Sequence, residues 1–248
     1  MARYSLTTSA LLFSLLITTS FQREGETKAS HGFAVVELFT SEGCSSCPAA
    51  DEAVIDMAKQ YKTNVFILGF HVDYWNHLGW KDAFSNPDYS ERQKQYASSF
   101  SLNSIYTPQI VVNGKTEFVG SEKNKLQRAI EKELSSNITS SIGLSAKENE
   151  GKKVMVNFKI ANLASSNINI ALVELHAESN VAKGENQGRQ LRHINIVRDF
   201  KTVDATGKQN SVYLNIPAGL SKKDCSVIAF VQDKINMHIT DATEASIQ

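Results

Sequence analysis

TSEGCSSCPAA, residues 40–50, contains two of the chain's three cysteines, Cys44 and Cys47, separated by two residues. A pair with this spacing can form a redox couple, supply half of a zinc site or make a structural crosslink. A zinc site would need two further ligands, commonly a second cysteine pair, whereas only Cys225 remains. A disulfide across two residues closes a very small loop and constrains the unfolded chain little. The motif therefore favours redox chemistry.

The segments on either side of the motif predict a parallel βαβ unit. Residues 33–39, FAVVELF, form a short apolar run typical of a buried strand. Apolar residues then recur from Ala50 to Tyr61 at the spacing of one helix face. Residues 64–72 form a second apolar run, which predicts another strand. Strand, helix and strand in this order indicate a right-handed crossover connection.

The motif lies where this helix is expected to begin. The first N–H groups of a helix are unpaired and carry a partial positive charge, so they stabilise a thiolate. This environment lowers the pKa of a cysteine thiol. We therefore expect Cys44 to be the exposed, attacking thiolate and Cys47, one turn into the helix, to be the resolving cysteine.

An aromatic segment and a hairpin follow the second strand. Residues 73–87 contain both tryptophans, Trp75 and Trp80, which either hold a substrate peptide beside the cysteines or form the core of an inserted loop. A helix is expected next. Residues 105–120 then predict a hairpin around the Asn113–Gly114 turn, followed by a last helix.

The second half of the chain has a different character. Between residues 138 and 248 only short strand-like runs occur, separated by turn signals, which predicts an all-β, sandwich-like domain. The fold class expected is therefore α/β: a domain of strands and helices over residues 32–137, followed by the β domain over residues 138–248.

The N-terminus predicts export. Residues 1–20 combine Arg3, an apolar run and small residues before a possible cleavage site, as in a secretory signal peptide, with an uncleaved anchor as the alternative. Residues 21–31 are polar and predict a linker. The mature protein is expected to be periplasmic or extracellular, where disulfides persist, and to have no membrane span.

The charge balance excludes one class of partner. Lys plus Arg and Asp plus Glu both number 26, so the formal net charge is zero and no basic face or tail is evident. Nucleic-acid binding is therefore not expected.

The motifs require no cofactor for thiol–disulfide exchange. The expected partners are protein thiols or disulfides and a second redox protein that recycles the cysteine pair.

The order of the expected elements resembles the thioredoxin fold. IYTPQIVVNGKTEFVG, residues 105–120, resembles the thioredoxin segment that carries a cis-proline before two strands. The resemblance implies that Pro108 is the cis-proline and that the backbone of Thr107 binds the substrate chain. Tyr106, beside this dipeptide, and Trp75 and Trp80, from the aromatic segment, are further candidate substrate-binding residues.

A narrower resemblance covers nearly all of the mature chain. VELFTSEGCSSCPAAD, FHVDYWNHLGWKDAFS, YTPQIVVNG and, in the second half, KGENQGRQLRHINIVR (183–198) resemble an exported bacterial family catalogued as domain of unknown function 1223. Four charged or titratable residues of the last segment are candidates for a role: Glu185, Arg189, His193 and Arg198. They could bind an anion, face the redox site across the domain interface or form surface ion pairs.

The sequence departs from thioredoxin beside the cysteines. Leu38 stands where thioredoxin has a buried aspartate six residues before its first cysteine. Glu37 is a possible proton acceptor, although alternation along a strand should turn it to the opposite face, where it would be solvent-facing or ion-paired. The dipeptide Ser45–Ser46 replaces Gly-Pro, so the redox potential and the direction of the reaction stay open.

Two functions follow. The first is an exported thiol–disulfide oxidoreductase that uses Cys44 and Cys47. The alternative is a non-catalytic binding module on a thioredoxin scaffold, with Cys44, Cys47 and His71 as possible copper(I) ligands. Cys225 is expected to be buried and inert.

Overall fold

One mixed β-sheet runs through both halves of the chain. The structure is a computed structural model and describes residues 1–2, 32–136, 141–161, 163–207 and 209–248. The signal peptide and linker predicted over residues 1–31 lie almost entirely outside the described residues. Within the described ranges, no helix combines the length and apolar character needed to cross a membrane.

The first half contains the predicted βαβ unit and hairpin. Strands β1 and β2 are parallel, β1 and β3 are antiparallel, and β3 and β4 form the hairpin. The elements in chain order are β1 (Ala34–Thr40), α1 (Cys47–Gln60), β2 (Val65–His71), η1 (Asn76–Leu78), α2 (Pro87–Ser99), β3 (Gln109–Val112), β4 (Thr116–Val119) and α3 (Lys123–Leu134).

The second half consists of strands with two short 3₁₀ turns. Strands β5, β6 and β9 form a separate three-stranded sheet, which packs on the C-terminal part of the large sheet over an apolar core. The elements are β5 (Gly143–Glu148), η2 (Glu150–Lys152), β6 (Lys153–Lys159), β7 (Ser166–Asn180), β8 (Gln190–Asp204), β9 (Ser211–Asn215), η3 (Lys222–Asp224), β10 (Cys225–Asp233) and β11 (Ile239–Ser246).

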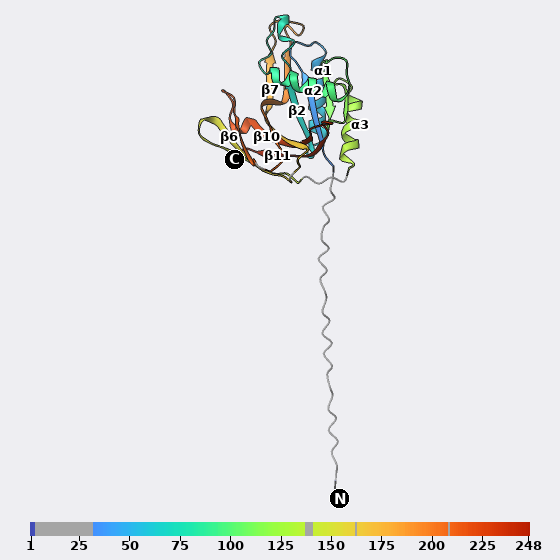
Figure 1. Cartoon of the computed structure of the whole chain (residues 1–248), viewed down its shortest axis with the longest axis vertical. Coiled ribbons are helices and arrows are strands. Elements are labelled where there is room, and N and C mark those ends of the chain that lie inside the picture. Colours follow the sequence, from blue (N-terminus) through green and yellow to red (C-terminus); the bar gives the residue numbers. More distant parts are fainter. Residues whose placement is uncertain (3–31, 137–140, 162, 208) are drawn as a thin grey trace.

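The two halves join edge to edge. The large sheet has eight strands in the order β11-β10-β7-β8-β2-β1-β3-β4, and β8 pairs with β2 in parallel at Gly69 and Ile196. The boundary predicted between residues 137 and 138 falls in a stretch outside the described residues, while the sheet is continuous between the halves. Figure 1 shows α3 on one side of the molecule and β6 on the other.

Helices cover both faces of the N-terminal strands. Helices α1 and α3 pack on one face, together with Leu38 and Ile110, and α2 packs on the other face with Phe39 and Phe70. Every residue of β1 is buried, as expected for a strand covered on both faces. The apolar run at residues 33–39 is continuous because helices cover both faces of this strand.

A buried ion pair holds α2 to the sheet. Glu37 points away from α1, and its carboxylate accepts hydrogen bonds from Arg92 Nε at 2.6 Å and Nη2 at 2.9 Å. The Tyr96 hydroxyl also donates to Glu37, and the Arg92 guanidinium donates to Gln232 Oε1 on β10 at 3.2 Å. Because Arg92 also lies over the rings of Phe70 and Phe200, it connects elements from both halves.

Replacing Arg92→Met should strongly destabilise the fold. The change leaves the Glu37 carboxylate buried without its cation, which is expected to lower the free energy of unfolding by about 3–5 kcal/mol in urea denaturation. The double variant Glu37→Gln/Arg92→Met should recover part of this loss. Lys94→Met, on the exposed side of the same helix, is the control and should change stability by less than about 1 kcal/mol. Equal losses of stability in Arg92→Met and Lys94→Met would contradict the prediction.

Candidate functional site

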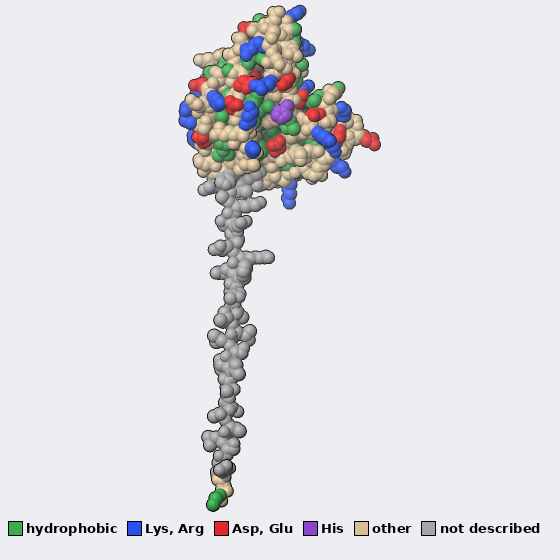
Figure 2. Space-filling view, turned by 180° about the vertical axis from the view of Figure 1, so that it is seen from behind, with side chains coloured by type: hydrophobic (Ala, Val, Ile, Leu, Met, Phe, Trp, Pro, Cys, Tyr) green, Lys and Arg blue, Asp and Glu red, His purple; other side chains and the backbone are tan. Residues whose placement is uncertain are grey.

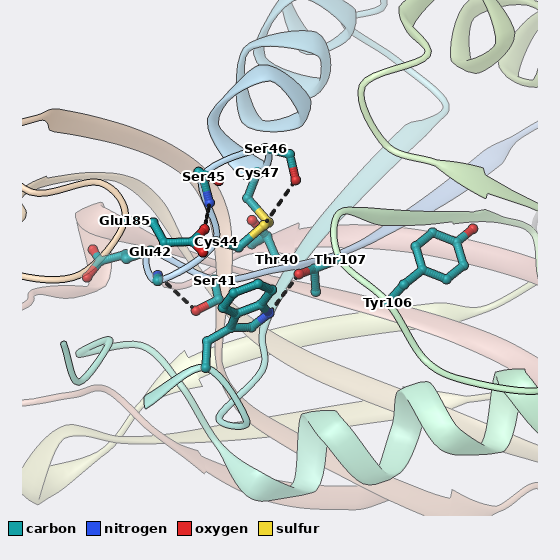
Figure 3. Close-up of a disulfide and its surroundings, with 12 residues drawn as sticks. Thr40, Ser41, Glu42, Cys44, Ser45, Ser46, Cys47, Tyr106, Thr107 and Glu185 are labelled. Atoms are coloured by element: carbon teal, nitrogen blue, oxygen red, sulfur yellow. Dashed lines mark hydrogen bonds between the residues drawn. A yellow bond between two sulfur atoms is a disulfide. The ribbon is translucent and has the colours of Figure 1, made fainter. Parts of the chain in front are cut away.

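Cys44 and Cys47 form a disulfide at the start of α1. Their Cα atoms are 5.4 Å apart and their sulfur atoms 2.25 Å apart. The helix begins at Cys47, and Pro48 occupies its first turn, where a missing N–H leaves no hydrogen bond unmade. The hydroxyl oxygen of Ser46 lies 3.4 Å from Cys44 Sγ, so the hydroxyl can donate a hydrogen bond to a Cys44 thiolate (Figure 3).

The prediction that Cys44 is exposed is wrong for this disulfide form. Both cysteines are fully buried, whereas Ser45 and Ser46 between them are exposed. Trp75 packs against the preceding residue so closely that a Cβ on Gly43 would lie 3.0 Å from the Trp75 Cβ. A partner can therefore reach Cys44 only if some covering group moves.

The hairpin segment meets the disulfide as the thioredoxin resemblance implies. The peptide bond between Thr107 and Pro108 is cis. Figure 3 shows Thr107 near the disulfide. The Trp75 indole N–H donates to Thr107 Oγ1 at 2.8 Å, so the tryptophan bridges the cysteine loop and the proline loop. The ring of Tyr106 is directed away from the sulfur atoms, and its hydroxyl donates to Glu117 on β4. The structure thus brings Thr107, Pro108 and Trp75 together but turns the Tyr106 side chain elsewhere.

Trp80 lies at a different part of the site. Its indole N–H donates to Glu42 Oε2 at 2.7 Å, two residues before Cys44. Gly184 of the second half approaches the Trp80 side chain closely, at 3.4 Å for an added Cβ. Trp80 therefore contacts the cysteine loop at Glu42, on the N-terminal side of the disulfide, and holds the Glu42 carboxylate.

The segment 183–198 faces the redox site, which was one of three alternatives open from the sequence. Glu185 Oε2 accepts a hydrogen bond from the Ser45 backbone N–H at 2.9 Å. The Asn186 side-chain amide donates to the carbonyl oxygens of Glu42 and Cys44, at 2.8 and 2.9 Å. Sequence reasoning missed Asn186, although it stands inside the motif that carried the family resemblance. The second half therefore fixes the backbone of the cysteine loop.

Beneath the loop lies a buried cluster of two histidines and three carboxylates. His71 Nδ1 is 2.7 Å from Asp82 Oδ2, and His193 Nδ1 is 3.2 Å from Asp51 Oδ1. The two imidazole rings meet edge to face at 4.7 Å. Glu42 completes the cluster, with Oε1 at 3.6 Å from His193 Nε2. The sequence offered His71 and His193 as candidates but gave no signal for Glu42, Asp51 or Asp82.

The electrostatics of this cluster favour charged groups. Burial acts to lower the pKa of His193, but Asp51 and Glu42 outweigh it and raise the pKa to about 10. Burial acts to raise the pKa of Glu42, yet the neighbouring His193 and the hydrogen bond from Trp80 help to hold that pKa below its usual value. The pKa of Asp82 is likewise lowered, because the charge and hydrogen bond of His71 outweigh burial. His193 is therefore an imidazolium between two carboxylates at neutral pH.

Two expectations need correction. Glu37 does not serve the cysteines, because its carboxylate is occupied by Arg92 on the face of the sheet opposite α1. The ion-paired alternative is the one found. His71 is not placed as a copper ligand with the cysteines, since Asp82 holds its Nδ1 and no group of three potential ligands in the described part of the chain is arranged for a metal ion.

The remaining candidates lie away from the disulfide or in ion pairs. Cys225 is buried in the core between the two sheets, and burial raises the pKa of its thiol to about 11. The guanidinium of Arg198 pairs with Glu174 at 2.6 Å and lies over the Phe84 ring. Arg189 donates to Asn186 Oδ1, which orients the amide on the cysteine loop. On the face displayed in Figure 2, basic and acidic side chains are interspersed.

The fold and the site together define a thioredoxin-like protein with a C-x-x-C disulfide and a strand-rich second half. The family model described as "Protein of unknown function (DUF1223)" matches residues 35–232. This match spans most of the chain, and the protein therefore belongs to that family.

Three further proteins are similar to this chain in sequence or in fold. A thioredoxin of Methanocaldococcus jannaschii is 34% identical over 100 residues, which are 40% of this chain and 94% of that protein. A solved protein of Agrobacterium tumefaciens is 27% identical, with a TM-score of 0.61 over 85% of this chain and 92% of its own. HBP35 of Porphyromonas gingivalis, at 19% identity and a TM-score of 0.52, covers 88% of this chain and 76% of its own and is similar in fold alone.

His193 should make stability depend on pH above neutrality. Its pKa rises from about 6.5 in the unfolded chain to about 10 in the fold, so its contribution is complete below pH 6.5 and is lost as pH rises through 10. Urea denaturation from pH 7 to 10 should show a fall on the order of a few kcal/mol.

His193→Gln should remove this part of the pH dependence. His77→Gln, at an exposed position, should keep it and serves as the control. Identical slopes for the wild-type protein and His193→Gln would contradict the assignment of the imidazolium.

Proposed function

We propose that the protein is an exported thiol–disulfide oxidoreductase that acts on protein thiols and disulfides. The observation that carries the proposal is the Cys44–Cys47 disulfide at the start of α1, beside the cis peptide bond that precedes Pro108. The helix N-terminus and the Ser46 hydroxyl both stabilise a Cys44 thiolate. Such stabilisation makes Cys44 the attacking sulfur and Cys47 the resolving one.

The reaction proceeds through a mixed disulfide. The Cys44 thiolate attacks one sulfur of a partner disulfide, and the other partner sulfur leaves as a thiolate. The Cys47 thiolate then attacks Cys44 Sγ, which forms the intramolecular disulfide and releases the second partner thiolate. Two electrons pass from the cysteine pair to the partner. A dithiol protein must return two electrons to the pair before the next cycle; the opposite direction uses the same steps in reverse.

The covering groups determine which partners can react. Cys44 is fully buried, and Trp75 is only partly buried and joined to Thr107 by a side-chain hydrogen bond. Movement of Trp75 would break its hydrogen bond to Thr107 and loosen its packing on Gly43, the residue next to Cys44. The backbone of Thr107 is then available to an extended segment of a partner protein.

Export is supported by the sequence. The apolar N-terminal segment is typical of a signal peptide. Disulfides between C-x-x-C cysteines are re-formed and exchanged readily in oxidising compartments. We therefore place the protein in the periplasm or outside the cell, together with a partner that recycles it.

Cys47→Ala should trap the partner. Without the resolving cysteine, the mixed disulfide on Cys44 persists, so a higher-mass adduct should accumulate in cells of the native host. The adduct should be visible on non-reducing gels and should disappear with reductant. Cys44→Ala/Cys47→Ala is the matched control and should give no adduct. A Cys47→Ala protein that forms no adduct would favour a non-catalytic binding module.

Glu185→Gln should make Cys44 more reactive. The substitution keeps an acceptor for the Ser45 N–H but removes a negative charge next to the developing thiolate. The pKa of the Cys44 thiol should fall. Alkylation of the reduced protein at a pH below that pKa should be roughly twofold to fivefold faster. Glu150→Gln, in the exposed turn η2 of the second half, is the control and should leave the rate unchanged. A slower reaction of Glu185→Gln would contradict the charge argument.

A further inference from the structure

The Cys44 carbonyl oxygen belongs to the turn that brings the two sulfur atoms together. It accepts the Cys47 N–H at 3.2 Å, within the turn, and the Asn186 side-chain amide at 2.9 Å, from the second half. The same amide donates to the carbonyl oxygen of Glu42 at 2.8 Å. One side chain thus fixes two peptide groups of the cysteine loop, and one of these groups is part of the cysteine pair itself.

The surroundings of Asn186 strengthen these two hydrogen bonds. The Asn186 side chain is fully buried, as are Glu42 and Cys44, and hydrogen bonds are stronger in a dry interior than in water. The Arg189 guanidinium donates to Asn186 Oδ1 at 2.9 Å, which fixes the amide with its NH₂ group toward the loop. The orientation of the amide is therefore determined by a third contact, outside the cysteine loop.

The segment that carries Asn186 is itself held by hydrogen bonds. Residues 181–189 join β7 to β8, and the Val181 N–H donates to the Arg189 carbonyl oxygen at 3.0 Å. The Val181 carbonyl oxygen accepts the Gly188 N–H at 2.8 Å. Gly188 has a φ of +79°, which glycine adopts readily. The segment is therefore a fixed support for the Asn186 side chain.

The Asn186 hydrogen bonds contribute differently to the two oxidation states of the pair. In the disulfide form the covalent bond keeps the turn closed, so loss of the amide leaves two buried carbonyl oxygens without this donor. In the dithiol form the turn has no covalent constraint, so it can open, gain conformational freedom and meet water. Asn186 therefore stabilises the disulfide more than the dithiol.

We propose that Asn186, from the second half of the chain, is a positioning residue that lowers the reduction potential of the Cys44–Cys47 pair. The inference rests on the proposed function and gives the second half a part in the redox reaction. By favouring the disulfide, Asn186 makes the dithiol a stronger reductant of partner disulfides.

An equilibrium with glutathione measures this effect directly. Two glutathione thiols transfer two electrons and two protons to the Cys44–Cys47 disulfide, which gives the protein dithiol and one glutathione disulfide. The full-length protein is equilibrated without oxygen at neutral pH over a series of glutathione ratios, acid-quenched and alkylated. Mass spectrometry then gives the dithiol fraction. Dithiothreitol and its cyclic disulfide replace glutathione where glutathione leaves the pair oxidised.

Asn186→Leu should shift this equilibrium toward the dithiol about tenfold, which is a reduction potential about 30 mV less negative. The substitution nearly keeps the size of the side chain and removes both N–H donors. Arg189→Met keeps the amide and removes only the contact that orients it, so the shift should be in the same direction and about twofold. Asn157→Leu, at an exposed position on β6, is the control and should leave the equilibrium unchanged.

Urea denaturation of the oxidised and the reduced forms separates positioning from general stability. If Asn186 positions the pair, Asn186→Leu should destabilise the disulfide form more than the dithiol form, by the same tenfold factor in the folding equilibrium constant. Equal destabilisation of the two forms would assign Asn186 a structural role only and would overturn the inference.

The outcomes distinguish this inference from the proposed function. An equilibrium constant for Asn186→Leu equal to that of the wild-type protein, or shifted toward the disulfide, would overturn the inference and leave the oxidoreductase standing. A wild-type disulfide that neither glutathione nor dithiothreitol reduces in the folded protein would overturn both. If Asn186→Leu does not fold, Arg189→Met decides, and an unchanged equilibrium constant in that variant would overturn the inference.

Discussion

The parallel pairing of β8 with β2 is the constraint on which the rest of the structure depends. Gly69 and Ile196 are the paired residues, and through them the strands of the second half continue the sheet of the first. Because β7 and β8 each have 15 residues, their hairpin extends from the sandwich core to the cysteine loop. This reach brings Asn186 onto the loop backbone and His193 beneath it.

Two groups of buried charges occupy opposite faces of this sheet. On the α2 face, Glu37 and Arg92 neutralise each other and tie α2 to β10. On the α1 face, His193 lies between Asp51 and Glu42, close to the disulfide. The Glu37–Arg92 pair makes two direct hydrogen bonds, whereas His193 Nε2 and Glu42 Oε1 face each other at 3.6 Å without a hydrogen bond. Both groups therefore join distant segments of the chain, but with different hydrogen-bond geometry.

Much of the first half could be predicted from the sequence, because its signals are local. The apolar runs predicted β1 and β2, the helical spacing after the motif predicted α1, and the Asn113–Gly114 turn predicted the β3–β4 hairpin. The resemblance to thioredoxin supplied the cis bond before Pro108. The burial of Cys44 could not be predicted, since Trp75 and Asn186, which contact its loop, approach from distant parts of the chain.

The sequence by itself determined the redox pair, its place at a helix start and the strand-rich nature of the second half. These properties depend on residue spacing and on the periodicity of apolar side chains. Only the tertiary structure decided that Glu37 pairs with Arg92 and that Asp51 pairs with His193, 142 residues away. A charged side chain is buried where an opposite charge meets it, and the sheet register that brings the two together is not a local property of either segment.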